Sequence, residues 1–161
     1  MALLQAADIV ELAMQLEQNG ESFYRAVAAK SAPPKVKALF EHLAGEEVKH
    51  RAIFAGLGRA VRERPLLTDE EWERYLEYLN ATVQSALFQG ADKALAAAER
   101  AANEQEAARM AMAFEKETLL FFYDLRDRVP AADRAVIDKV VAEEKTHIAR
   151  LAEILRPAGS E

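Results

Sequence analysis

Hydrophobic residues along the chain recur at intervals of three and four positions, and alternation by two is nowhere sustained. This spacing is typical of amphipathic α-helices, because residues three and four apart lie on one face of a helix. Glycine and proline fall in clusters rather than at the short intervals that separate strands. The pattern therefore predicts an all-α fold.

Six helices are expected, and they span about 6–30, 35–57, 68–88, 92–102, 103–129 and 133–155. The segments around Pro33–Pro34 and Pro130 interrupt the pattern, because proline lacks a backbone donor and restricts the residue before it. Gly56 and Gly58 are expected to end the second helix, and residues 59–67, which include Pro65, to form a connector. Gly90 is expected to end the third.

Two of the helix starts carry a capping signal. Thr68 is followed three residues later by Glu71, and Asn103 is followed at the same spacing by Glu106. A Ser, Thr, Asp or Asn cap with a Glu three residues on satisfies backbone donors that the first turn leaves free. Both positions are therefore predicted to begin helices.

The chain contains an internal repeat. GEEVKH at 45–50 and AEEKTH at 142–147 both read small-Glu-Glu-x-x-His at an offset of 97 residues, and MQLEQNGESFY resembles MAFEKETLLFF at an offset of 98. We interpret 1–161 as a single domain with repeat one at about 5–57, a helical insert at about 59–103 and repeat two at about 104–155. The expected architecture is a four-helix bundle of two antiparallel hairpins. The insert packs on this bundle or reaches a second subunit.

Charged residues interrupt the apolar faces of these helices. Glu47 and His50 share a face with Phe40, Leu43 and Phe54, which must point into the core. The same holds in the other three bundle helices for Glu17, Glu115, Glu144 and His147. Four carboxylates and two imidazoles are therefore expected to meet in the interior of the bundle.

Such a cluster needs positive charge. A buried ionised carboxylate costs several kcal/mol unless it is paired, and no lysine or arginine lies on these faces. Two divalent cations would offset four carboxylates, and each Glu-x-x-His could hold one edge of a metal pair. The predicted metal ligands are Glu17, Glu47, His50, Glu115, Glu144 and His147.

The alternative for these residues is that they are solvated charges on helix surfaces, which the core register and the repeat make the weaker interpretation. Glu21 and Glu117 are the rivals of Glu17 and Glu115, but they fall beside the apolar face. Three further polar residues are expected at the surface, and these are His42, Glu46 and Glu143.

Aromatic residues allow two interpretations. Tyr24 could donate a hydrogen bond to a metal-bound carboxylate, or it could be a core aromatic like Phe122, its counterpart in the repeat. Trp72, Tyr75 and Tyr78 are expected to provide packing for the insert, to which we assign no chemistry.

Taken together, these motifs resemble the ferritin-like superfamily, and specifically rubrerythrin-type di-iron carboxylate proteins that lack the rubredoxin module. The resemblance covers about 5–57 and 104–155. It implies a centre of four Glu and two His residues, in which Glu47 and Glu144 bridge or chelate the metals. It also implies a homodimer or larger homo-oligomer, with or without helix exchange.

Two departures from the family pattern matter. Thr118 stands where typical rubrerythrins carry an additional glutamate, so the ligand set is closer to the symmetric one of bacterioferritins. The chain has no cysteine, whereas the rubredoxin module would carry four. The resemblance therefore implies a separate electron-donor protein.

Composition narrows the remaining choices. With 27 acidic and 21 basic residues the net charge is −6, which argues against a nucleic-acid partner and against an anionic membrane surface. No apolar run approaches the roughly 20 residues of a membrane span, and the N-terminus does not resemble a signal peptide, so a cytoplasmic location is expected. Carboxylate and imidazole ligands without thiolates favour two iron ions, with manganese or a mixed iron and manganese pair as alternatives.

Three functions fit these expectations. The first is an oxidoreductase that reduces hydrogen peroxide or dioxygen at the di-metal site, as in rubrerythrins. The second is a ferroxidase that handles iron, as in ferritins. The third is a non-catalytic metal-binding interaction protein. Retention of the metals through turnover would distinguish the first from the second.

Overall fold

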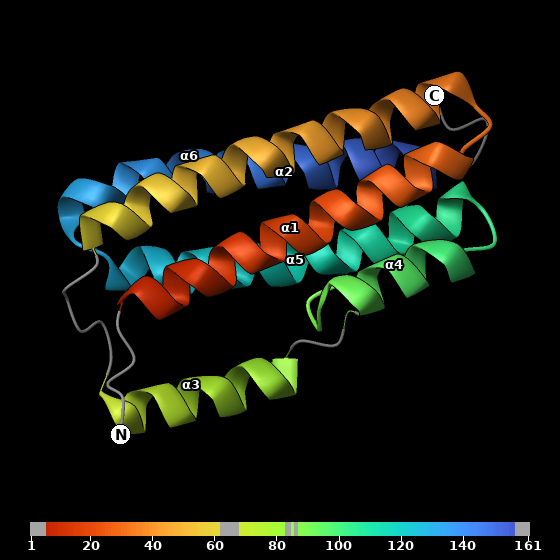
Figure 1. Ribbon diagram of the computed structural model, residues 1–161. Helices are drawn as coiled ribbons and strands as arrows, with labels where there is room; N and C mark the ends of the chain where they lie inside the picture. The colour runs from red at the N-terminus through yellow and green to blue at the C-terminus, as the bar shows by residue number, and fades with distance from the viewer. Residues whose placement is uncertain (1–5, 62–67, 83–84, 86, 157–161) are drawn as a thin grey trace.

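The computed structural model describes residues 6–61, 68–82, 85 and 87–156. Within these ranges the chain forms six helices and no strand, namely α1 (Ala6–Lys30), α2 (Pro34–Val61), α3 (Asp69–Thr82), α4 (Ala91–Arg100), α5 (Glu104–Arg128) and α6 (Ala131–Leu155). Helices α1 and α2 form one antiparallel hairpin and α5 and α6 form another, and the two hairpins pack into a bundle (Figure 1). The predicted all-α bundle is confirmed.

Both capping signals form the predicted bonds. The Thr68 N–H donates to Glu71 Oε2 at 2.8 Å, and the Glu71 N–H donates to Thr68 Oγ1 at 3.3 Å. At α5 the Glu106 N–H donates to Asn103 Oδ1 at 2.9 Å, and the Ala102 N–H donates to Glu106 Oε2 at 2.8 Å. These side chains satisfy backbone groups that the first helical turn leaves free.

The predicted end of the second helix is wrong, because α2 continues through both glycines to Val61. A Cβ at Gly58 would lie 3.2 Å from Val10 Cγ1, so this glycine allows α1 and α2 to approach closely. A glycine that serves packing does not end a helix. Residues 62–67 of the expected connector, including Pro65, lie outside the described residues.

The predicted end of the third helix is also wrong, because α3 stops at Thr82 rather than near Phe88. Residues 87–89 form a turn, in which Leu87 is 1% exposed and its carbonyl accepts a 2.8 Å hydrogen bond from Asn19 Nδ2. This buried contact with α1 draws the chain out of the helical path. Gly90 then adopts a positive φ of 137°, a conformation that favours glycine, directly before α4.

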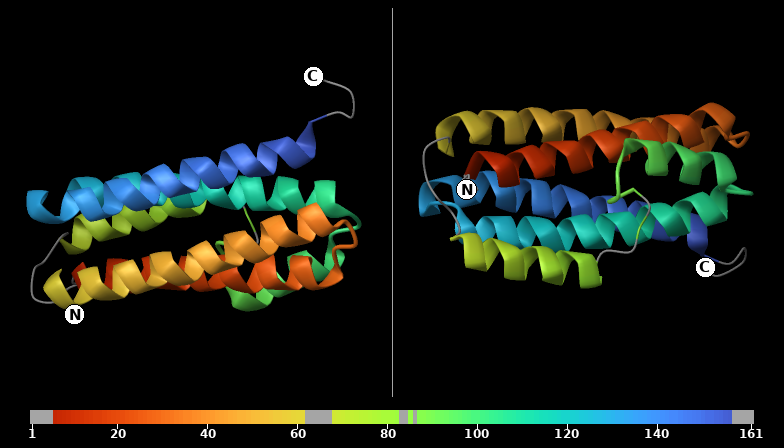
Figure 2. Two further views of the ribbon diagram at one scale, coloured as in Figure 1. Left: turned by 90° about the horizontal axis from the view of Figure 1, so that it is seen from above. Right: turned by 60° about the horizontal axis from the view of Figure 1, so that its bottom comes forward.

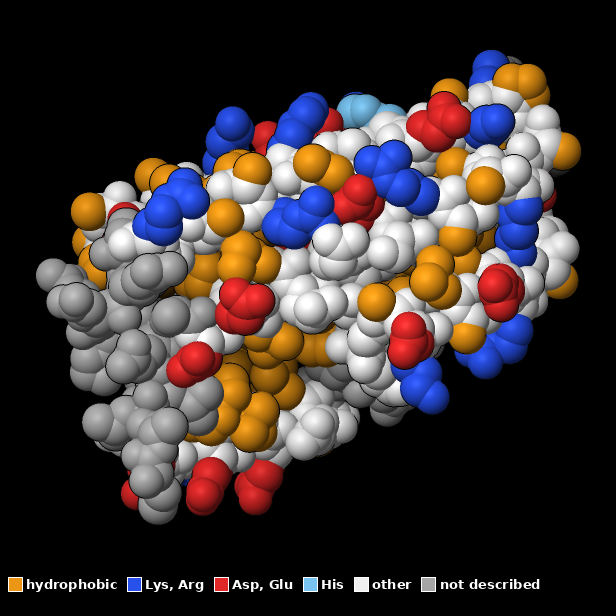
Figure 3. Space-filling model, in the orientation of Figure 1, with side chains coloured by type: hydrophobic (Ala, Val, Ile, Leu, Met, Phe, Trp, Pro, Cys, Tyr) orange, Lys and Arg blue, Asp and Glu red, His pale blue; other side chains and the backbone are white. Residues whose placement is uncertain are grey.

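Both helices of the insert pack on the chain's own bundle. Helix α4 lies against α1, where Lys30 Nζ donates to the Ala101 carbonyl at 2.8 Å. Helix α3 runs beside α5 (Figure 2). The Tyr75 ring stacks on Phe121 with ring centroids 6.4 Å apart, and Arg128 Cζ lies 4.9 Å from the Tyr75 centroid. Figure 3 shows hydrophobic side chains gathered in the recess between α3 and the bundle. The packing role predicted for Tyr75 is therefore confirmed.

The bundle interior is apolar at both ends and polar in the middle. Large aromatic side chains fill much of it, and Phe54 and Phe122 pack with ring centroids 4.8 Å apart. In the described part of the chain, no helix combines the length and the apolar character needed to cross a membrane. The polar middle of the bundle holds the candidate site.

Candidate metal centre

The structure brings all six predicted ligand residues together inside the bundle. Each of the four bundle helices contributes at least one of them, and every one is at most 2% exposed. They are Glu17 from α1, Glu47 and His50 from α2, Glu115 from α5, and Glu144 and His147 from α6. The core register read from the sequence therefore places them correctly.

Their ligand atoms form two overlapping groups that share two carboxylates. In each group one nitrogen and three carboxylate oxygens all lie within 4.8 Å of one another. The groups are Glu17, Glu47, His50 and Glu144, and Glu47, Glu115, Glu144 and His147. This arrangement offers two adjacent cation positions, with Glu47 and Glu144 between them.

The half that contains His50 is built around the Nδ1 atom of its ring. This nitrogen lies 2.9 Å from Glu144 Oε1, 3.4 Å from Glu17 Oε2 and 3.9 Å from Glu47 Oε2. All four of these residues belong to the first of the two groups.

The half that contains His147 has nearly the same geometry. Its Nδ1 lies 2.9 Å from Glu144 Oε2, 3.4 Å from Glu115 Oε1 and 3.6 Å from Glu47 Oε1. The His50 and His147 rings stack with centroids 5.5 Å apart. Both rings therefore direct Nδ1 toward the shared carboxylates.

The bonding of the site fits a pair of metal ions. Eight side-chain atoms of the six residues are buried without a well-directed hydrogen bond, including both oxygens of Glu17 and Glu144 and Nδ1 of both histidines. Buried polar atoms without partners are costly, and native proteins contain few of them. Carboxylate oxygens with imidazole nitrogens are ligands that suit iron and manganese.

The two carboxylates considered as alternatives to Glu17 and Glu115 have partners outside the cluster. Glu21 is held in ion pairs with Arg25 at 2.8 Å and Arg51 at 2.9 Å. The Glu117 carboxylate accepts a hydrogen bond from the Ser85 N–H at 3.0 Å. The structure therefore brings Glu17 and Glu115, rather than these two, into the cluster.

Three of the buried carboxyls hold their protons more tightly than usual. Burial raises the pKa of Glu17 and Glu47 well above the ordinary value, and the charges of Glu144 and Glu115 add to the rise. Burial and the charge of Glu144 raise the pKa of Glu115 to about 8. In the absence of cations, the bundle interior therefore favours the neutral form of these carboxyls more strongly than water does.

Glu144 loses its proton more readily than usual, and the two histidines hold theirs more tightly. Burial alone would raise the pKa of Glu144, but the His147 and His50 rings, whose Nδ1 atoms lie 2.9 Å from its two oxygens, outweigh burial and hold this pKa well below its usual range. Burial alone would lower the pKa of each histidine, but bonds to the carboxylates raise it to about 9 for His50 and about 11 for His147. A metal ion must displace the protons of these rings in order to bind.

Tyr24 contacts the cluster directly. Its hydroxyl is fully buried and donates to Glu115 Oε1. Burial and the charge of Glu115 raise the pKa of Tyr24 well above 10. The phenol therefore stays protonated and acts as the hydrogen-bond donor. Of the two interpretations of this residue, the structure supports the hydrogen bond to a candidate ligand.

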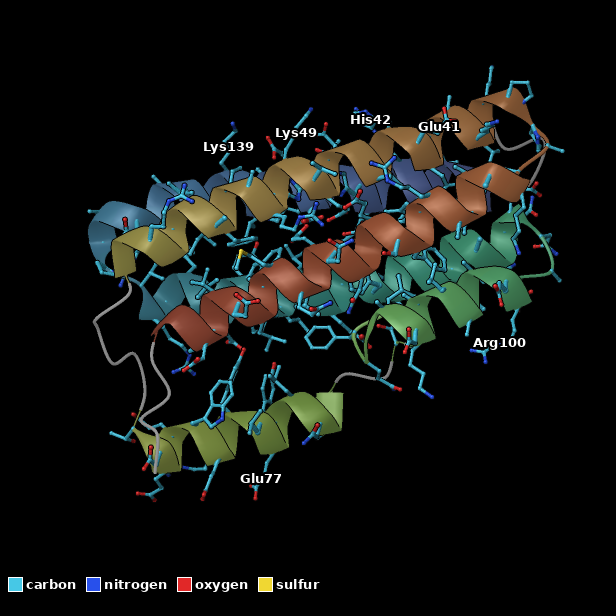
Figure 4. The ribbon with its side chains drawn as sticks, viewed as in Figure 1. Glu41, His42, Lys49, Glu77, Arg100 and Lys139 are labelled. Carbon is cyan, nitrogen blue, oxygen red and sulfur yellow. The ribbon has the colours of Figure 1, made fainter. Side chains whose placement is uncertain are left out.

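The expectation that Glu143 is only a surface charge is wrong. Its side chain is 34% exposed, and its Oε2 lies 2.8 Å from His50 Nε2, the outer nitrogen of the ring. A histidine that coordinates through Nδ1 has an Nε2–H that needs an acceptor. Glu143, which precedes Glu144 on α6, supplies that acceptor from the other hairpin. His42 is exposed, as expected (Figure 4).

Gly20 is a site residue whose importance the sequence did not reveal. A Cβ there would lie 3.0 Å from Phe114 Cε1 and 3.3 Å from Glu47 Cδ, so the absence of a side chain makes room for the shared carboxylate. Its counterpart in the repeat is Thr118, which is 2% exposed and whose Oγ1 has no hydrogen-bond partner among the described residues.

Comparisons with known proteins bear on the family and the fold of the chain. The family model for rubrerythrin matches residues 8–155. The crystal structure of a candidate ferritin-like diiron-carboxylate protein from Thermotoga maritima is similar at a TM-score of 0.64, covers 96% of each chain and is 21% identical. This likeness confirms the predicted ferritin-like fold. No curated protein matches the sequence.

Proposed function

Because the chain belongs to the rubrerythrin family, we propose that its six buried ligand residues bind two iron ions and that the protein then reduces hydrogen peroxide or dioxygen. The observation that carries this proposal is the pair of overlapping ligand groups with Glu47 and Glu144 in common. Manganese, alone or with iron, suits the same ligands and is the alternative.

Each residue has a defined part in holding the metals. Glu17 and His50 would bind one ion, and Glu115 and His147 the other. Glu47 and Glu144 lie within reach of both positions and would keep the two ions adjacent. A bound pair of reduced iron ions supplies the two electrons that, with two protons, convert hydrogen peroxide into two water molecules.

The protein around the ligands excludes water and holds a proton. Phe54, Phe114 and Phe122 are at most 1% exposed and form part of the apolar interior around the cluster. Tyr24 donates its hydroxyl proton to Glu115 and so keeps that carboxylate oriented. Water-poor surroundings strengthen the attraction between the ligands and a bound cation.

The electrons for repeated turnover come from a partner in this proposal. The 161 residues contain no cysteine, so they offer no thiolate ligands for a rubredoxin-type or iron–sulfur centre. We therefore propose a separate electron-donor protein.

A second candidate function is iron handling by a ferroxidase reaction. Thr118 occupies the position that would carry the additional glutamate of typical rubrerythrins, which leaves a symmetric set of four Glu and two His. That set resembles the one of bacterioferritins. In this case Fe(II) would be the substrate and would leave the site after oxidation.

Anaerobic addition of Fe(II), followed by stopped-flow mixing with peroxide and separately with dioxygen, tests both candidates. We expect faster oxidation by one of the two oxidants and retention of two irons per chain after re-reduction. Release of the iron to a chelator would instead favour the ferroxidase. A Glu41→Ala variant, changed on the outer surface of α2 (Figure 4), should react like the unmodified protein. Absence of any iron-dependent reaction would contradict both.

A further inference from the structure

The two histidines of the centre differ in what lies behind them. His50 Nε2 is 2.8 Å from Glu143 Oε2, whereas among the described residues no hydrogen bond or ion pair joins His147 Nε2 to a carboxylate. The residue that the repeat places behind His147 is Glu46, the counterpart of Glu143. A Glu46 oxygen does lie within 4.8 Å of a ring nitrogen of each histidine.

Lys49 forms an ion pair with this glutamate. Its Nζ forms an ion pair with Glu46 Oε1 at 2.5 Å, one turn along α2, and its side chain is 68% exposed. Figure 4 shows Lys49 on the outer side of the bundle. The Glu46 side chain is only 15% exposed, so it is more buried than the surface position expected for it, but its Oε1 is engaged by this lysine and not by His147. The counterpart of Lys49 in α6 is Thr146, whose hydroxyl donates to the Ala142 carbonyl at 3.2 Å.

Resting on the proposed metal pair, we infer that Lys49 is a positioning residue that makes the two metal positions unequal. By holding Glu46 away from His147, it leaves that histidine without the acceptor that Glu143 supplies to His50. The first metal ion therefore binds in the half of the site that contains His50.

The physical reason is the role of the acceptor behind a metal-bound histidine. A carboxylate that accepts the outer N–H fixes the ring orientation and the tautomer, and it makes the coordinating nitrogen a stronger donor. Loss of such a partner typically lowers metal affinity about 10- to 100-fold. The two halves share Glu47 and Glu144, so this difference is not offset by the bridging ligands.

An anaerobic titration with Co(II), monitored by calorimetry, measures the difference in affinity between the two metal positions. We expect two successive binding steps whose affinities differ about 10- to 100-fold. Crystals grown with one equivalent of Co(II) should show anomalous density beside His50 Nδ1. A first ion beside His147 would overturn the inference.

Variants separate the positioning effect from simple charge. Lys49→Thr, which copies the residue of the second repeat, should free Glu46 and bring the weaker step toward the stronger one. Combining Lys49→Thr with Glu46→Gln should abolish that gain. Glu143→Gln should weaken the first step, whereas Glu46→Gln alone should change neither step by more than about twofold, well below the 10- to 100-fold expected for a working partner. Thermal melting checks that each variant is folded.

The outcomes distinguish this inference from the proposed function. Equal gains in Lys49→Thr and in the double variant would show that only the lysine charge matters, and the inference would fail. Two equal binding steps in the unmodified protein would also overturn the inference, but the proposal that the site binds two metal ions would stand. No Co(II) and no Fe(II) binding at all would remove the proposed function and the inference together.

Discussion

The two helix hairpins of this protein place the same ligand types at the same positions but surround them differently. Each supplies one Glu from its first helix and Glu-x-x-His from its second. The neighbours differ at the pairs Gly20 and Thr118, Tyr24 and Phe122, and Lys49 and Thr146. The repeat therefore places the candidate ligands, and these neighbours give the two halves different surroundings.

The largest effect is expected at the residues that the two halves share. Glu47→Ala or Glu144→Ala should abolish binding of two metals per chain, because each removes a ligand from both positions. Glu17→Ala removes a ligand from one half only and should leave one ion bound. Metal analysis of the purified variants measures this. Two irons retained in both shared-ligand variants would show that the site is assigned wrongly.

Glu47→Ala should not unfold the metal-free chain. Its buried carboxyl has a raised pKa because of burial and the charges of Glu17 and Glu144, so at neutral pH it costs free energy to keep it in the folded interior, as a charge or with a bound proton. Removing it relieves that cost while leaving the surrounding apolar contacts in place. A melting temperature close to that of the metal-free parent therefore separates loss of binding from loss of fold.

Removal of the metals should reverse the pH dependence of stability. The folded pKa of Glu115 is about 8 against an ordinary 4.5, so between these values the folded chain binds more protons than the unfolded chain. Stability of the metal-free protein therefore falls as pH rises through this window. His50 and His147, raised from 6.5 to about 9 and about 11, extend the fall to higher pH. Glu144, whose pKa is lowered, acts only at acidic pH.

With metals bound the trend should be the opposite, because the ligands bind metal in their deprotonated forms. Melting curves from about pH 5.5 to about 8.5, a window set by these titrations, with metal and with chelator, make the comparison. We expect the melting temperature to fall with pH in chelator and to hold or rise with metal. A metal-free protein that becomes more stable toward pH 8.5 would contradict the charge assignment.

The glycine in the first half should resist substitution. Gly20→Ala adds a methyl group 3.0 Å from Phe114 Cε1 and 3.3 Å from Glu47 Cδ, and overpacking of this kind costs about 1–3 kcal/mol. Gly45→Ala on α2 is the matched control, since nothing lies within 4 Å of its added methyl group, and it should gain up to about 1 kcal/mol from helix propensity. Denaturant unfolding of the metal-free proteins compares the two. Equal stabilisation by both changes would show that Glu47 does not need the space at Gly20.

The smallest effect is expected from Tyr24, whose counterpart in the second hairpin is a phenylalanine. Tyr24→Phe makes this position like Phe122 and removes the donor to Glu115 Oε1, at a cost of about 1 kcal/mol. Binding should weaken in the half that contains His147 and stay unchanged in the other. An equal loss in both steps of the metal titration would argue against a local effect.

Much of the centre was predictable because the repeat and the helical periodicity act together. The register of Phe40, Leu43 and Phe54 requires Glu47 and His50 to face inward, and the structure places both in the core. Contacts between helices were harder to foresee. The acceptor of His50 is Glu143 from α6, and its role depends on how the two hairpins dock rather than on any pattern within one helix.

The remaining discrepancies have the same origin. Gly58 continues α2 because Val10 of α1 lies against it, and Asn19 of α1 binds the Leu87 carbonyl beyond the end of α3. Local signals predicted helix ends that tertiary contacts shifted. The starts of α3 and α5 depend on residues close in sequence, which cap the helices at Thr68 and Asn103. Those positions were predicted correctly.

The central claim is that one buried cluster binds two metal ions between the hairpins. Anomalous diffraction at the iron edge from crystals of the iron-saturated protein tests it most directly. We expect two peaks per chain, one beside His50 Nδ1 and one beside His147 Nδ1, with Glu47 and Glu144 contacting both. A single peak at full saturation, or iron bound on the outer side of the rings next to Glu143, would contradict the account.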